Sequence, residues 1–269
     1  MLVDSHCHLD FPELAADQDA VVARARAAGV SPLLTIGTQM RRAASIKAIA
    51  ERHAEVFCSV GVHPDHVADD GETISAEQLA AHAAHPKVIG FGESGLDYFY
   101  QPPTQLTREQ YHMRQQESFR EHLRAAALTG LPIIIHSRQA EDDTARQMAE
   151  EGAGKNPALG GVMHCFSSGR SLAEAAVAMG FYISFSGILT FKKSDELRTI
   201  AKDVPLDRLL VETDAPFLAP HPLRGKTNEP AFVVHTAAVL AEVKGVTPEE
   251  IARITTENFY RLFKKATRP

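Results

Sequence analysis

The sequence has few cysteines: its 269 residues contain only Cys7, Cys58 and Cys165. An odd number of cysteines without zinc-finger spacing argues against both a disulfide framework and a structural zinc knuckle. No stretch approaches the roughly 20 apolar residues that a membrane-spanning helix needs. The first residues also lack the basic and then apolar pattern of a secretory signal. These absences predict a reduced protein of the cytoplasm, with no part in a membrane.

Basic residues do not outnumber acidic ones, since 28 Lys and Arg stand against 34 Asp and Glu, for a net charge of −6. This balance argues against a broadly basic surface that wraps duplex nucleic acid, although a local basic patch could still hold phosphates. No linker, low-complexity tract or internal repeat divides the chain. We therefore expect one domain over residues 1–269. The sequence leaves the oligomeric state open, a monomer included.

Short apolar runs alternate with segments of helical character, which predicts a parallel sheet with crossover helices. The expected strands lie at 2–3, 32–36, 56–62, 88–91, 131–135, 160–163, 181–185 and 209–211. Eight strands are the number that an α/β fold of the TIM-type (β/α)8 barrel class requires. The expected helices lie at 18–28, 40–53, 76–85, 108–129, 139–151, 170–179, 195–202, 231–244 and 248–265.

Two helix ends carry local signals of their own. Thr247 and Pro248, followed by Glu250, form the start signal of a capped helix. Gly130 and then Pro132 should end the long helix at 108–129, because glycine favours a helix C-cap and proline cannot continue a helix.

The first apolar run leads into a His-x-His pair, His6 and His8. Alternate residues of a strand share a face, so these imidazoles should project together while Cys7 points away. A single pair of this kind is a weak signal for a metal site. Cys7 and Cys165 each adjoin a histidine, but alternation turns both thiols from this face, and we interpret them as packing residues.

Four further apolar runs also end in potential metal ligands. Two end in imidazoles and two in carboxylates: His136, His164, Glu93, and Glu212 with Asp214. Active sites of a (β/α)8 barrel lie at the carboxyl ends of its strands, where side chains from separate strands converge. Chance rarely places such residues at five strand ends, so we expect one shared site.

Imidazole and carboxylate ligands suit Zn, Mn, Fe or Mg, and this set is large enough for one or two divalent ions. Two neighbouring ions can activate a water and stabilise the leaving oxygen of a phosphodiester. We expect Asp214 to bind metal and accept the proton of the attacking water, and Glu93 to bridge two ions. Glu212 should orient a ligand from outside or act as an outer ligand, or else serve as a helix cap or ion-pair partner.

With these residues, the chain closely resembles the TatD family of metal-dependent deoxyribonucleases, a branch of the amidohydrolase-like barrels. The resemblance runs in order from one end of the chain to the other, and is therefore more specific than any single motif. The matching stretches are VDSHCHLD at 3–10, GVHP at 61–64, GESGLDY at 92–98, HSR at 136–138, HCFSSG at 164–169, ETDAP at 212–216, NEP at 228–230 and ENF at 257–259.

The resemblance implies a divalent-metal site and hydrolysis of DNA, in several members as a 3'–5' exonuclease that prefers single strands. It implies Mg or Mn as the ion and single-stranded DNA or a 3' end as the partner. Ser94 departs from the family pattern, which has an apolar residue or threonine after the glutamate, and should alter packing beside Glu93 without removing the site. The implied ligands are His6, His8, Glu93, His136, His164 and Asp214.

Weaker candidates lie in loops of the same face. His63 could contact a phosphate or polarise the leaving group, or be an ordinary loop histidine. Tyr98 and its two aromatic neighbours could stack on an unpaired base, worth about 1–3 kcal/mol per base, or pack in the core. Histidines within helices, among them His122, are interpreted as surface or capping residues. The basic candidates for phosphate contact, each also interpretable as a solvated charge, are Arg138, Arg224 and Lys226.

Two other functions remain open from the residues alone. The same ligands on this barrel could hydrolyse an amide, ester or aminoacyl bond, because a fold does not determine its chemistry. The chain could also bind nucleic acid in a metal-dependent way without turnover. An open metal position beside Asp214 favours an enzyme over a binding protein.

Overall fold

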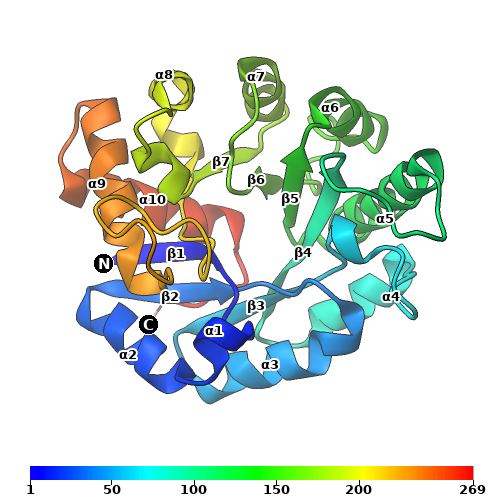
Figure 1. The fold of residues 1–269 in the computed structure, drawn as a ribbon, viewed down its shortest axis with the longest axis horizontal. Helices are drawn as coiled ribbons and strands as arrows, with labels where there is room; N and C mark the ends of the chain where they lie inside the picture. The colour runs from blue at the N-terminus through cyan, green and yellow to red at the C-terminus, as the bar shows by residue number, and fades with distance from the viewer. Residues whose placement is uncertain (269) are drawn as a thin grey trace.

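The computed structural model describes residues 1–268, and within them eight parallel strands form one sheet in the order of the sequence. Figure 1 shows the sheet curled into a barrel with the helices around it. The strands are β1 Leu2–Cys7, β2 Val30–Thr35, β3 Val56–Val60, β4 Val88–Asp97, β5 Ile133–Arg138, β6 Gly161–Met163, β7 Tyr182–Phe185 and β8 Leu209–Val211. The predicted TIM-type barrel is therefore confirmed.

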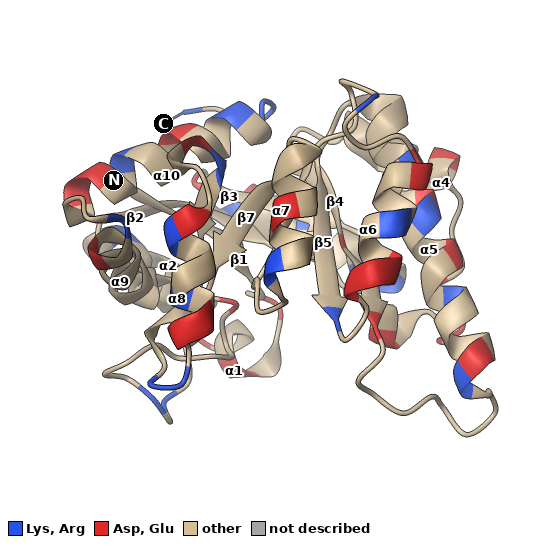
Figure 2. Ribbon diagram, turned by 90° about the horizontal axis from the view of Figure 1, so that it is seen from above, with Lys and Arg blue, Asp and Glu red and all other residues tan. Residues whose placement is uncertain are grey.

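The helices lie between successive strands and after the last one, as the alternation of the sequence predicts. Charged residues of both signs are spread over their outer surfaces (Figure 2). Within residues 1–268, no helix is long and apolar enough to cross a membrane. The helices are α1 Pro12–Ala15, α2 Gln18–Ala27, α3 Ala43–Arg52, α4 Ala76–Ala81, α5 Arg108–Thr129, α6 Glu141–Glu150, α7 Arg170–Ala178, α8 Asp195–Asp203, α9 Val233–Lys244 and α10 Pro248–Leu262.

The interior of the barrel is a packed core at the end where the strands begin. Each strand contributes at least one buried side chain to a single cluster, which also contains Phe259 and Phe263. Phe259 belongs to α10 and Phe263 follows it, so this helix closes the amino-terminal end of the barrel. The functional side chains are left to the opposite end.

The helix ends follow the local signals. Gly130 caps α5 in the left-handed conformation with a φ of 72°, and the hydroxyl of Thr247 accepts the backbone N–H of Glu250 at the start of α10. The expected last helix is three residues too long, because α10 ends at Leu262. The predicted helix at 231–244 begins instead as a turn of 3-10 helix over Pro230–Phe232.

β4 continues well beyond the expected end at residue 91, because two glycines let it approach β5 closely. A Cβ on Gly95, whose φ is +148°, would collide with the carbonyl oxygen of His136. A Cβ on Gly92 would lie only 2.6 Å from the carbonyl oxygen of Ile134. The expected strand stops at residue 91 because the apolar run ends there. In the structure the two glycines carry the strand through Glu93 to Asp97.

The first and last strands meet through only a few contacts. Cys7 and Ala215 form an isolated bridge, the backbone N–H of His8 donates to the carbonyl of Ala215, and the N–H of Asp214 donates to the carbonyl of His6. We call this junction the β1/β8 seam. It brings the His-x-His pair beside the acidic residues that follow β8.

Candidate metal centre

His6 and His8 project from the end of β1 to the same side, as strand alternation predicts. Their Nε2 atoms lie 3.3 Å apart and both side chains are buried. The thiol of Cys7 points elsewhere and donates to the carbonyl of Leu34. Cys7 is thus a packing residue, as expected.

Two carboxylates complete a first donor group around these imidazoles. The Nε2 of His6 lies 3.4 Å from Glu93 Oε2 and 3.5 Å from Asp214 Oδ1, and the Nε2 of His8 lies 3.8 and 3.4 Å from the same oxygens. Ligands about 2.0–2.2 Å from one tetrahedral ion are separated by about 3.3–3.6 Å. The spacing of the first donor group therefore fits one divalent ion.

The other carboxylate oxygen of Glu93 faces a second donor group. Glu93 Oε1 lies 2.6 Å from His164 Nε2, 2.9 Å from His136 Nδ1 and 3.4 Å from His63 Nε2. The nitrogens of His136 and His164 that face it are 3.4 Å apart. One carboxylate thus presents its two oxygens to two sets of imidazoles, an arrangement that fits a carboxylate shared by two ions.

Two buried carboxylates lie behind the imidazoles of the second donor group. Asp97 Oδ2 is 2.9 Å from the Nε2 of His136, and Glu212 Oε1 is 3.2 Å from the Nδ1 of His164. Glu212 also accepts the backbone N–H of Cys165, so it acts on the far side of His164 from Glu93. Both contacts are of the kind that fixes the ring orientation of a metal-binding histidine. The sequence argument does not single out Asp97.

Asp214 is held in place by a buried turn after β8. It adopts a φ of 57°. Asp4 accepts both the backbone N–H and the hydroxyl of Thr213, at 2.8 and 2.6 Å, and burial raises the pKa of Asp4 to about 8 despite these bonds. The side-chain amide of Asn228 donates to the carbonyl of Thr213. This network orients the Asp214 carboxylate toward the first donor group.

The charges of the site complement one another. Burial opposes ionisation of Glu93, but the charges of His164 and His63 and a hydrogen bond from His136 outweigh it and hold the pKa of Glu93 well below its usual range. Burial likewise opposes protonation of His136, yet hydrogen bonds to Asp97 and Glu93 raise its pKa to about 9. A divalent cation would supply this positive charge directly, since imidazole binds metal as a neutral base. The first donor group therefore suits a cation in charge as well as in spacing. In the second group, His164 and His136 lie at hydrogen-bond distance from Glu93 Oε1, 2.6 and 2.9 Å, so its residue types suit a cation and its donors would move apart to bind one.

His122 does not lie on the surface, and the expectation for it is wrong. It is completely buried on the inner face of α5, where its Nε2 accepts the backbone N–H of Val62 at 3.0 Å and its Nδ1 donates to the carbonyl of Ser118. Burial lowers its pKa to about 4. His122 lies on the face of α5 that also buries Phe119 and Leu123, so the expectation failed because a polar residue type does not by itself mean an exposed position. His122 secures the segment that leads to His63.

With this geometry established, comparison with known proteins shows what the chain is related to. A family model described as "TatD related DNase" matches residues 3–264. The metal-dependent hydrolase YcfH of Escherichia coli K12 is 44% identical over 97% of this chain and 95% of its own length. The chain belongs to the TatD family. The TatD relative YabD of Bacillus subtilis, also named a metal-dependent hydrolase, is 40% identical over 98% of this chain and 99% of its own.

Solved structures agree with the family assignment. The crystal structure of the E. coli TatD homologue YjjV superposes with a TM-score of 0.87 and 32% identity, over 98% of both chains. An organophosphorus hydrolase from Deinococcus radiodurans shares only the fold, with a TM-score of 0.61, 16% identity and coverage of 97% and 92%. This TatD-family protein is thus a metal-dependent hydrolase.

Ser94, which departs from the expected family pattern, lies buried beside Glu93 at 1% exposure. Its hydroxyl oxygen has no hydrogen-bond partner within residues 1–268. A small apolar group at this position would leave no unpaired polar atom.

The centre opens to solvent on the side of three of its residues. The side chains of Asp214, His63 and His136 retain 14, 16 and 19% exposure, whereas those of His6, His8, Glu93 and His164 retain at most 5%. A substrate would therefore reach the centre across Asp214, His63 and His136. His63 also accepts the backbone N–H of Asp65, which orients its ring.

The expected substrate-binding residues fall into two places at the rim. The Arg138 guanidinium packs 3.7 Å from the centroid of Phe99, and Phe99 and Tyr100 are both 46% exposed. Across the mouth, in the long loop after β8, Arg224 packs 3.7 Å from the centroid of Phe191, and Lys226 is exposed. All these side chains lie outside the two donor groups.

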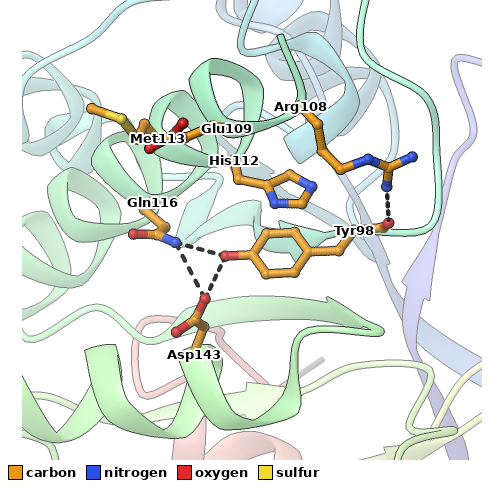
Figure 3. A pocket seen from close by; sticks show the side chains of 7 residues that line it. All are labelled: Tyr98, Arg108, Glu109, His112, Met113, Gln116 and Asp143. Carbon is orange, nitrogen blue, oxygen red and sulfur yellow. Dashed lines mark hydrogen bonds between the residues drawn. The ribbon is translucent and has the colours of Figure 1, made fainter.

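Tyr98 turns away from the centre toward α5 and α6. Figure 3 shows its ring against His112, at a centroid distance of 3.8 Å, and its hydroxyl bonded to Asp143 and Gln116. One ring face and the hydroxyl are thus already engaged, in a separate pocket that Arg108 also lines. Phe99 and Tyr100, rather than Tyr98, present exposed rings.

Proposed function

We propose that this TatD-family protein is a metal-dependent deoxyribonuclease that hydrolyses a phosphodiester bond of single-stranded DNA or of a DNA 3' end. The observation that carries the proposal is the division of donors by Glu93, whose two oxygens face two separate groups 3.4–3.8 Å and 2.6–3.4 Å away. A pair of close ions is the arrangement that in-line displacement at phosphorus uses. The description of the matching family model points the same way.

His6, His8, Glu93 and Asp214 would hold one ion, and Glu93, His136 and His164 the other. When bound, the ions lower the pKa of water and stabilise the charge of the leaving oxygen. Asp214 is the donor-group carboxylate with the greatest exposure, so it can meet a water molecule and accept its proton as the oxygen bonds to phosphorus. The P–O bond to the leaving group breaks, and that oxygen keeps the electron pair.

The surrounding residues position these groups. Asp97 and Glu212 keep the rings of His136 and His164 turned toward Glu93. His63 lies beside Glu93 Oε1 at the open side, where it can contact a phosphate oxygen or protonate the leaving oxygen.

The rim supplies the two kinds of contact that a single strand needs. Arg138, Arg224 and Lys226 can neutralise backbone phosphates. Phe99 and Tyr100 offer exposed rings on which unpaired bases can stack, at about 1–3 kcal/mol per base. Because paired bases already stack on one another, this rim should favour single strands over duplex.

The proposal is tested by hydrolysis of end-labelled single-stranded and double-stranded oligonucleotides by metal-stripped protein, with Mg, Mn or Zn added back separately. We expect metal-dependent shortening from the 3' end, fastest on single strands, and none in excess chelator. Asp214→Asn protein, prepared and loaded in the same way, serves as the control for a contaminating nuclease.

Two outcomes would contradict the proposal. Hydrolysis that persists in excess chelator would exclude the metal mechanism. Absence of cleavage with every ion, in protein that demonstrably binds metal, would instead favour an amide, ester or aminoacyl substrate, which the same centre could attack, or metal-dependent binding of nucleic acid without turnover.

A further inference from the structure

Two phenylalanine rings continue outward from the first donor group and have no part in the proposed chemistry. The ring of Phe11 stacks on that of His8, with centroids 4.5 Å apart and an angle of 21° between the planes. Phe217 meets Phe11 edge to face at 5.8 Å. This contact chain leads directly from a candidate metal ligand to the surface, where Phe217 is 48% exposed.

Phe217 is held by a rigid turn. Its backbone N–H donates to the carbonyl of Asp214 at 2.9 Å, and its carbonyl accepts the side-chain amide of Asn228 at 2.6 Å. Asn228 is fully buried and also holds the carbonyl of Thr213. The exposed ring is therefore presented at a set position, three residues after Asp214, and a ligand that meets it loses little entropy to ordering of the protein.

Phe11 and Phe217 lie on the opposite side of the mouth from the other exposed rings. Phe11 and Phe217 stand at the β1/β8 seam, whereas Phe99 and Tyr100 follow β4. In an eight-stranded barrel with strands in sequence order, β1 and β8 lie across the mouth from β4 and β5. Exposed aromatic side chains therefore flank the two donor groups on opposite sides.

We propose that Phe217, backed by Phe11, is a stacking platform for the nucleobase next to the scissile phosphate, on the side of the centre opposite Phe99 and Tyr100. This inference rests on the proposed deoxyribonuclease function. Every base has a flat π face, so such a platform accepts any sequence but requires a base that is free of its neighbours. Phe217 would then be a specificity-determining residue for single strands.

The test combines a variant of the protein with a variant of the substrate. The kcat/KM of metal-loaded wild type and Phe217→Ala is measured on a single-stranded oligonucleotide, and on the same oligonucleotide with one abasic residue beside the cleaved bond, placed in turn on either side. Phe217→Tyr keeps an aromatic ring. Leu128→Ala removes an apolar side chain that is 64% exposed, near the end of α5 and away from the mouth. Thermal unfolding establishes that each variant is folded.

We expect Phe217→Ala to lower kcat/KM on the intact strand by roughly 5- to 150-fold, mainly through KM, the range for loss of one stacked base. With the abasic residue on one of the two sides, the kcat/KM of the wild type should fall by a similar factor relative to the intact strand. The kcat/KM of Phe217→Ala, already low on the intact strand, should fall little further on the same abasic strand. Phe217→Tyr and Leu128→Ala should behave as wild type on both strands. Equal losses by Phe217→Ala on intact and abasic strands would overturn the platform and leave the nuclease function standing. Failure of wild type to cleave any DNA would overturn both.

Discussion

Replacement of Asp97 by Asn tests whether His136 depends on the carboxylate behind it. The two side chains meet at 2.9 Å, and the other ring nitrogen of His136 is 2.9 Å from Glu93. The other oxygen of Asp97 accepts the backbone N–H of Phe99 at 2.9 Å. Asn has one acceptor oxygen for these two contacts, so the change removes the negative charge and one acceptor. Gln115 bonds the backbone N–H and C=O of residue 97, and these two bonds do not involve the carboxylate.

The expected size of the effect follows from the loss of charge. A hydrogen bond to a charged group contributes about 1.5–3 kcal/mol, against about 0.5–1.5 kcal/mol between neutral groups. The difference of about 1–1.5 kcal/mol corresponds to roughly a tenfold weaker site. Removal of such a partner from a metal-binding histidine typically weakens metal affinity by roughly 10- to 100-fold. The expected tenfold loss lies at the lower end of this range.

The assay is competition between metal-stripped protein and a chromophoric chelator for Zn or Mn. Asp97→Asn should raise the Kd of one ion about tenfold and leave thermal unfolding of the metal-free protein nearly unchanged. Asp143→Asn is a matched control, because Asp143 bonds the hydroxyl of Tyr98 but contacts no candidate ligand. The reasoning is refuted if Asp97→Asn binds both ions like wild type, or if the control weakens binding equally.

Three further predictions concern catalysis, pH and packing. Asp214→Asn should lower kcat on oligonucleotides by about 10²–10⁴-fold with the unfolding midpoint retained, and undiminished turnover would refute the assigned role. Because burial lowers the pKa of His122 from 6.5 to about 4, the unfolded chain binds a proton in this window that the folded chain does not, and stability falls as pH drops. His122→Gln should remove about 2 kcal/mol of the loss between pH 7 and 5, measured by urea denaturation. Gly95→Ala should destabilise by roughly 3 kcal/mol or more, and Gly180→Ala, whose Cβ meets open space, by clearly less.

The strand-end argument locates most of the centre because parallel strands deliver their last residues to one face. His6 and His8 share a side as alternation requires, and His136, His164 and Asp214 reach the same place from three other strands. This part of the site depends on local pattern and topology, both of which a sequence displays.

The residues that the sequence argument misses depend on tertiary contacts. Asp97 lies beyond the expected end of β4, because the apolar run stops at Phe91 while the close approach of Gly92 and Gly95 to β5 carries the strand further. His122 is a polar residue on the face of α5 that buries Phe119 and Leu123, and its burial depends on the hydrogen bond from Val62 in another part of the chain. Phe217 lies on an irregular loop, where no periodicity indicates that its ring stands beside the mouth.

The β1/β8 seam makes the two ends of the chain interdependent. Asp4 and Thr213, which join across it, are 209 positions apart, whereas Glu93 and His136 of the second donor group are separated by only 43. During synthesis the second donor group can therefore assemble from the middle of the chain, while the first must wait until the segment after β8 has emerged. An ion shared by His6, His8 and Asp214 would close this long loop much as a covalent crosslink does. A nascent or truncated chain that lacks the segment after β8 therefore has no complete first donor group.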